Sequence, residues 1–142
     1  MKPKTGIKKP KGAVWIERAI IESPFCVGLC QTENQFKNEL KRLGVSESED
    51  VQWVTDGKDA TVTEFSGTKK HEKCFLVGIK QDKTTRPIEV IGLLVHEAVH
   101  VWQRIREDIN EDKPSNEFEA YAIQNISTRL IDAYKLKKCL LK

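Results

Sequence analysis

Long apolar runs, cysteine-rich stretches and a large excess of one charge are all missing from this sequence. Its 142 residues include four cysteines, three histidines and one methionine, and the formal net charge is only +3 although 32% of the residues are charged. No apolar run reaches the roughly 20 residues that span a bilayer, so we predict no membrane-spanning helix and no membrane partner. The N-terminus carries lysines without an apolar stretch, so we predict no secretory signal and a cytoplasmic location.

The four cysteines do not form a recognisable motif. Cys26 and Cys30 are separated by three residues, whereas zinc knuckles and thioredoxin-like sites have two residues between their cysteines. We interpret Cys26, Cys30, Cys74 and Cys139 as free thiols that act as small hydrophobic residues in a reducing cell. A Cys26–Cys30 disulfide is the alternative.

The length of 142 residues predicts one domain with its own core. We assign residues 1–12 to a basic flexible tail, because they include five lysines, two prolines and two glycines, and residues 13–142 to the domain. The lysines could contact nucleic acid without sequence preference, but the tail has no arginine and no aromatic residue. We therefore interpret the tail as solvated and do not expect nucleic acid to be a partner.

The N-terminal half of the domain carries two helical patterns. Apolar residues at helical spacing from Ala13 predict a short first helix, which Ser23-Pro24 ends. Thr32 and Gln35 form a capping-box pattern, and Gly44 follows the last apolar residue, so a second helix is predicted between Thr32 and Gly44.

Strand-like runs and two further helices follow. A turn is predicted at Asp56-Gly57, between the first two of these runs. Pro87 suits the first turn of a helix. The predicted class is α+β, with a sheet of about three strands. The predicted strands are Val51–Thr55, Thr61–Phe65 and Cys74–Ile79, with Phe25–Cys30 a strand or a loop, and the last helix is predicted over Asn116–Lys138.

The strongest chemical motif is HExxH, formed by His96, Glu97 and His100. It lies in an apolar run, Ile88–Trp102, that predicts a buried helix. Residues four apart share one face of a helix, so the two imidazoles can supply two ligands of a tetrahedral Zn²⁺. Glu97 can then reach a water on the metal and accept its proton. The alternative is a pair of core histidines satisfied by hydrogen bonds, but burying them and a glutamate without partners would be costly, which favours a metal.

A catalytic zinc site needs a third protein ligand and one open position. The extended metzincin motif is excluded, because Gln103 and Arg106 stand where it requires glycine and histidine. Among the acids downstream, Glu117 and Glu119 lie on the predicted last helix, and Glu117 is favoured as the ligand because it shares a polar face of that helix with Tyr121 and Gln124. Glu119, three residues after Asn116, suits a capping box instead. The alternative is that Glu117 only stabilises the helix N-terminus.

The run HEAVH followed by EFEAY resembles the gluzincin metallopeptidases, in which a second helix carries a Glu-x-x-(small) motif. The longer stretch also resembles small zincin-like proteins of tailed phages and prophages. The resemblance implies a minimal zincin-like fold, with a small sheet packed on the HExxH helix and a C-terminal helix that bears Glu117 as third ligand. It also implies a location in the bacterial host cytoplasm or a virion. The chain departs from this family at two places. Tyr121 stands where thermolysin-like enzymes often have an acid, and His71 is the only histidine left for the role of a second catalytic histidine.

These patterns predict a zinc-dependent hydrolase, a small metallopeptidase that acts on a peptide or protein substrate. Zn²⁺ would be held by His96, His100 and Glu117, and Glu97 would be the general base. The substrate is expected to lie along the edge of the sheet, with Thr61–Phe65 as the edge strand. The alternative is a non-enzymatic, phage-associated protein whose zinc is structural and closed by a fourth ligand such as His71, acting in assembly or partner binding.

Overall fold

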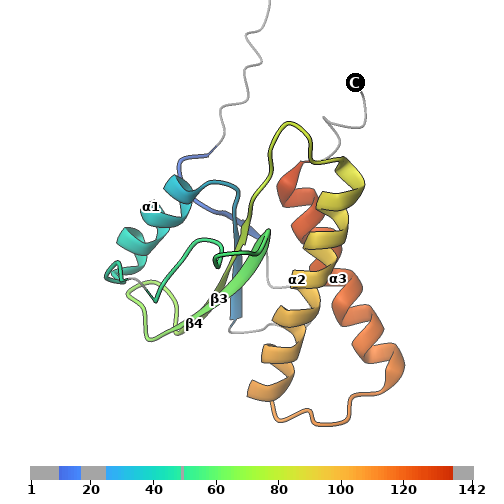
Figure 1. Ribbon diagram of the computed structural model, residues 1–142. Coiled ribbons are helices and arrows are strands. Elements are labelled where there is room, and N and C mark those ends of the chain that lie inside the picture. Colours follow the sequence, from blue (N-terminus) through green and yellow to red (C-terminus); the bar gives the residue numbers. More distant parts are fainter. Residues whose placement is uncertain (1–9, 17–24, 49, 136–142) are drawn as a thin grey trace, which may run out of the picture.

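The computed structural model describes residues 10–16, 25–48 and 50–135, which form a mixed sheet between helices (Figure 1). One helix, α1, packs on one face of the sheet, and α2 and α3 pack side by side on the other. The α+β class is therefore confirmed. The elements are β1 (Val14–Ile16), β2 (Phe25–Cys30), α1 (Glu33–Leu43), β3 (Ala60–Ser66), β4 (Lys73–Ile79), α2 (Pro87–Asp108) and α3 (Asn116–Tyr134).

The sheet has four strands in the order β1-β2-β4-β3. Strands β2 and β4 run parallel in the middle, and β1 and β3 pair antiparallel to them on either side. The sheet thus has one strand more than predicted. Strand β3 lies at one edge, as predicted for Thr61–Phe65, and this edge runs beside α2.

Alternation along the two central strands divides the core into two layers. Successive side chains of a strand point to opposite faces of its sheet. One set of strand residues, including Leu29 and Val77, packs against α2 and α3, and its neighbours, including Cys30 and Leu76, pack against α1. Because both faces are covered, β2 and β4 are almost entirely buried, which is why their sequences read as continuous apolar runs.

The helix predicted from Ala13 is wrong over Val14–Ile16, which form a strand. Val14 and Ile16 pack with the layer under α2 and α3, whereas Trp15 packs with the layer under α1. This alternation with a period of two belongs to a strand. The remainder of the predicted helix and Ser23-Pro24 lie outside the described residues.

The strand predicted at Val51–Thr55 is also absent, although its apolar side chains are used. Val51 and Trp53 pack against the α1 layer, and the indole Nε1 of Trp53 donates to the Cys30 carbonyl at 2.9 Å. The backbone of this segment crosses over the sheet at Gly78, where an added Cβ would meet the Trp53 carbonyl oxygen. The segment therefore covers the sheet and does not extend it.

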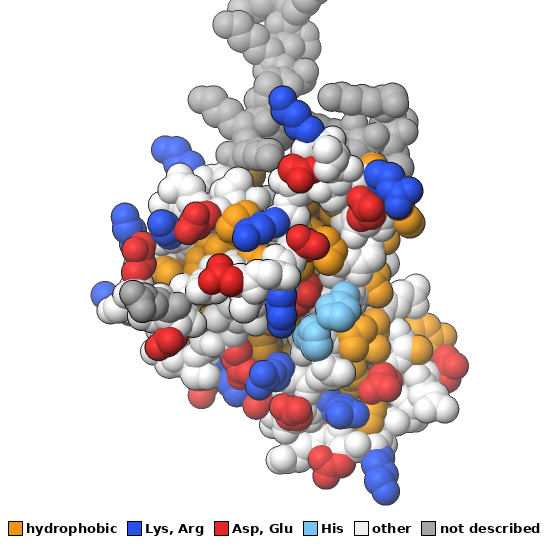
Figure 2. All heavy atoms as spheres, viewed as in Figure 1, with side chains coloured by type: hydrophobic (Ala, Val, Ile, Leu, Met, Phe, Trp, Pro, Cys, Tyr) orange, Lys and Arg blue, Asp and Glu red, His pale blue; other side chains and the backbone are white. Residues whose placement is uncertain are grey.

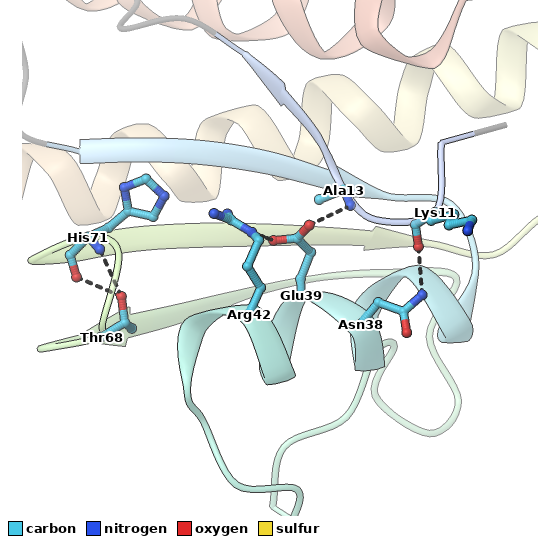
Figure 3. A network of polar contacts seen from close by, with 7 residues as sticks. All are labelled: Lys11, Ala13, Asn38, Glu39, Arg42, Thr68 and His71. Carbon is cyan, nitrogen blue, oxygen red and sulfur yellow. Dashed lines mark hydrogen bonds and ion pairs between the residues drawn. The ribbon is translucent and has the colours of Figure 1, made fainter.

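Helix α1 begins and ends as predicted, and it holds the start of the described chain. Thr32 is its N-cap and accepts from the Gln35 N–H, and Gly44 ends it with φ 72°. Figure 3 shows the buried carboxylate of Glu39 accepting from the Ala13 N–H and from Arg42. Side chains of α1 also donate to the carbonyls of residues 10 and 11, so the last residues of the predicted tail lie against α1.

Helices α2 and α3 begin at Pro87 and Asn116, as predicted. Helix α3 ends at Tyr134, where Lys135 takes a left-handed conformation, so it is shorter than predicted. Neither α2 nor any other helix in the described ranges is long and apolar enough to cross a membrane.

Candidate metal centre

The two histidines of the HExxH motif converge at the middle of α2. Their Nε2 atoms are 3.1 Å apart, and the rings meet edge to face. Two nitrogen ligands on one tetrahedral zinc, each at 2.0–2.1 Å, would be separated by about 3.3 Å. The spacing of four residues on a helix therefore places both nitrogen atoms where two of the ligands of one metal ion would lie. Without a metal, the same contact is a hydrogen bond between one protonated and one bare nitrogen.

The His100 ring is oriented by Gln103. Its Nδ1 lies 3.0 Å from the Gln103 Oε1, an atom that can only accept, so Nδ1 carries the proton and Nε2 is left bare. A bare Nε2 is the form that binds a metal, and a hydrogen bond at the other ring nitrogen is the usual support of a ligating histidine. Sequence reasoning missed this role, although the spacing of three residues from His100 places Gln103 on the same helix face.

The motif is not buried in the way the sequence predicted. Both histidines are exposed, and only the opposite side of α2, with Leu94, Ala98 and Val101, packs into the core. Helix α2 is covered by the sheet on one side and by α3 on another, which leaves the histidine face open. In Figure 2 the pale-blue histidine side chains lie at the surface, close to charged side chains.

Glu97 differs from the two histidines of the motif in being buried, with 5% of its surface exposed. Burial raises the pKa of its carboxyl above the ordinary value, and electrostatic interactions with His100, His96 and Lys58 oppose this rise only in part. A carboxylate with a raised pKa is a stronger base, which suits a group that must accept a proton near neutral pH. The helix directs Glu97 about 100° around from His96, so all three side chains can border one space.

That space is a hollow of about 540 Å³ between α2 and the N-terminal part of β3. His96, Glu97 and His100 line it on α2, and residues of the edge strand β3 line it on the other side. Charged side chains complete the lining; they are Lys58, Asp59, Glu64 and Arg104. The structure therefore combines two imidazole nitrogens at the spacing of metal ligands, a buried carboxylate and an accessible strand edge in one place.

Glu117, the predicted third ligand, is not brought to the histidines. It is exposed at the start of α3 and is absent from the lining of the hollow. Within the described ranges, no three His, Cys, Asp or Glu side chains are grouped closely enough to hold a metal ion. The two histidines thus fit two ligand positions, and Glu117 as the third stays a prediction.

Glu119 is the acid of α3 that contacts α2. Its carboxylate accepts from the Trp102 indole at 2.9 Å and lies 3.8 Å from Arg106. The capping role predicted for Glu119 with Asn116 is wrong, because Ser115 is the N-cap of α3 and accepts from the N–H of Phe118. The helix begins one residue earlier than a cap at Asn116 would require.

His71 and Tyr121 lie away from the hollow. The His71 ring packs 5.1 Å from the Trp15 ring, on the side of the sheet that α1 covers (Figure 3). Tyr121 is 65% exposed on α3 and does not line the hollow. The structure therefore brings neither the imidazole of His71, predicted as a possible fourth ligand, nor the phenol of Tyr121 to the pair formed by His96 and His100.

No protein-family model, no curated protein and no solved structure matches this chain.

Proposed function

We propose that the protein is a zinc-dependent hydrolase of the metallopeptidase type, in which His96 and His100 hold the metal and Glu97 is the general base. The observation that carries the proposal is the convergence of the two Nε2 atoms beside the buried Glu97 carboxylate, in a hollow open to solvent. A pair of histidines that only satisfied each other would need neither the buried acid nor the hollow.

The residues divide the chemistry between them. When bound, zinc lowers the pKa of a coordinated water towards neutrality and polarises a carbonyl group. Glu97 takes a proton from the attacking water and passes it to the nitrogen of the leaving amine. His100 keeps its bare Nε2 directed at the metal because Gln103 holds the opposite ring nitrogen.

The edge strand gives the substrate a place to lie. Strand β3 pairs with β4 along one side only, and its residues Ala60, Thr61 and Val62 line the hollow beside the histidines. An extended peptide can pair with the other side of such a strand through backbone hydrogen bonds, with little demand on its sequence. We therefore propose an unfolded or flexible polypeptide as the substrate class.

The test compares the protein with Glu97→Gln and with a matched control, Glu107→Gln, which removes the same charge from an exposed position of α2. We expect one zinc per chain in all three proteins, and its loss in His100→Ala or on acidification. Glu97→Gln should cleave unfolded protein substrates about a hundred to ten thousand times more slowly than the control.

Two results would count against this function. Absence of a bound transition metal after purification without chelator, together with weak binding of added zinc, would remove the metal centre. Bound zinc without cleavage of any substrate in a broad panel would instead favour the non-enzymatic alternative, in which the metal is structural.

A further inference from the structure

The hollow contains a cation whose role the metal and the general base do not explain. We propose that the Lys58 ammonium group is a catalytic residue that binds the oxygen of the scissile carbonyl and stabilises the negative charge formed on it when water attacks. This inference rests on the proposed hydrolase function and adds a residue to that same site. Lys58 lines the same hollow as the two histidines and precedes β3 in the sequence.

The backbone holds Lys58 in a defined place although its side chain is exposed. Its N–H donates to the Thr55 carbonyl at 3.0 Å, which closes a turn, and Gly57 within that turn has φ 79°. Gly57 adopts this left-handed conformation without strain because glycine has no Cβ. The turn leads directly into β3, so the start of the lysine side chain is fixed relative to the edge strand on which a substrate would lie.

The lining of the hollow places Lys58 beside the reacting groups. Lys58 borders the same space as His96, Glu97 and His100. A substrate carbonyl held next to the two histidines would therefore lie in the space that Lys58 also borders.

Lys58 is also available, whereas the other cation of the hollow is engaged. Arg104 lies 4.0 Å from Glu64, and Glu64 is bound in turn by Lys73. Lys58 makes no ion pair with any side chain that the structure describes. A lysine has a flexible stem and a compact charge, so it can follow an oxygen as the carbonyl carbon becomes tetrahedral.

The chemistry of amide hydrolysis requires such a group. Attack of water forms a bond to the carbonyl carbon and moves the π electron pair onto the oxygen, and collapse of the intermediate expels the amine, which takes its proton from Glu97. Donors aimed at that oxygen typically contribute a hundred- to a thousandfold in rate. His71, the third histidine of the chain, lies beside Trp15 and cannot serve here.

The experiment compares Lys58→Met and Lys58→Arg with a control, Lys83→Met, which removes a charge from an exposed position outside the hollow. Zinc content is measured first and should be equal in all. We expect Lys58→Met to lower kcat about a hundred- to a thousandfold with little change in KM, and Lys58→Arg to restore part of the loss.

A binding measurement gives a readout that does not depend on turnover. A phosphinic peptide carries a tetrahedral anion, whereas a peptide of the same sequence with an uncleaved amide does not. Calorimetry on the zinc-loaded proteins should show that Lys58→Met weakens binding of the phosphinic peptide at least tenfold and leaves binding of the amide peptide unchanged. Equal weakening for both peptides would show that Lys58 only anchors the substrate, and this would overturn the proposal.

The outcomes separate this inference from the function on which it rests. If the unmodified protein cleaves substrates and Lys58→Met does so at the rate of Lys83→Met, the role of Lys58 is wrong and the hydrolase stands. If the zinc-loaded unmodified protein neither cleaves substrates nor binds the phosphinic peptide, the hydrolase is wrong and the role of Lys58 falls with it.

Discussion

At the scale of single residues, the structure adds to the HExxH motif a partner that the motif does not contain. The convergence of the His96 and His100 rings was predictable, because a spacing of four residues on a helix leaves little freedom in where the two rings point. Gln103 was not, because an exposed glutamine has many possible partners and only the placed side chains show which one it takes. Its contact with the His100 Nδ1 makes it the support of the proposed metal ligand.

The role of Gln103 can be tested by zinc affinity. Gln103→Ala removes the acceptor that fixes the His100 ring, so we expect zinc to bind about ten- to a hundredfold more weakly while the fold is kept. Competition with a chromogenic chelator measures the affinity, and circular dichroism checks the fold. Gln124→Ala, an exposed glutamine of α3, is the control. Equal zinc affinity in both variants would remove Gln103 from the site.

At the scale of elements, the sequence predicts where local rules are strict and fails where packing decides. Thr32, Gly44 and Pro87 mark helix ends correctly because caps and turns depend on neighbouring backbone groups. The patterns at Val14–Ile16 and Val51–Thr55 show which side chains are buried, but not whether their backbone pairs with a strand. Pairing depends on which strand edge is open, and that is a property of the whole sheet.

The choice between Glu117 and Glu119 as third ligand also depends on packing. Whether Glu117 or Glu119 faces α2 depends on how α3 is rotated against α2, and apolar spacing leaves that rotation open by tens of degrees. The structure resolves it through contacts: Trp102 packs against Phe118 and donates to Glu119, while Glu117 faces solvent. The prediction of a ligand on α3 therefore has to be tested residue by residue.

Paired substitutions on α3 distinguish the two acids. Glu119→Ala removes the acceptor of the partly buried Trp102 N–H and should lower the free energy of unfolding by about 1–2 kcal/mol. Glu117→Ala removes an exposed side chain and should change it by about 0.5 kcal/mol or less. Urea unfolding of the metal-free proteins measures both. If Glu117 is the third ligand, its replacement weakens zinc binding; unchanged zinc affinity would refute that assignment.

At the scale of the whole molecule, the sheet separates two regions of different chemistry. The candidate metal centre lies on the α2 side and is open to solvent, whereas Cys30 and Cys74 are fully buried on the side covered by α1. The described cysteines, Cys26, Cys30 and Cys74, are free thiols. Because the sheet lies between them and the histidines, Cys30 and Cys74 cannot serve as ligands of the same metal ion, and we interpret them as part of the packing.

The buried thiols should make the fold sensitive to alkali. Burial, and to a smaller extent the charge of Glu39, raises the pKa of the Cys30 thiol from 9.0 to about 12, and burial raises the pKa of Cys74 to about 11. Above pH 9 these thiols ionise in the unfolded chain but remain protonated in the folded protein. The folded state then binds more protons than the unfolded state, so its stability is complete below pH 9 and falls as the pH rises towards 12.

We therefore expect Cys30→Ala to flatten the alkaline fall in stability. Each thiol can contribute a slope of at most about 1.4 kcal/mol per pH unit, and removing Cys30 removes its share. Urea unfolding at several pH values between 8 and 11 measures the slope under reducing conditions. Val77→Ala, which also removes buried volume but no ionisable group, should lower stability by a similar amount at every pH and keep the slope of the unmodified protein. Equal slopes in Cys30→Ala and Val77→Ala would show that the Cys30 thiol ionises as readily in the folded protein as in the unfolded chain, and would contradict its assignment to a dry interior.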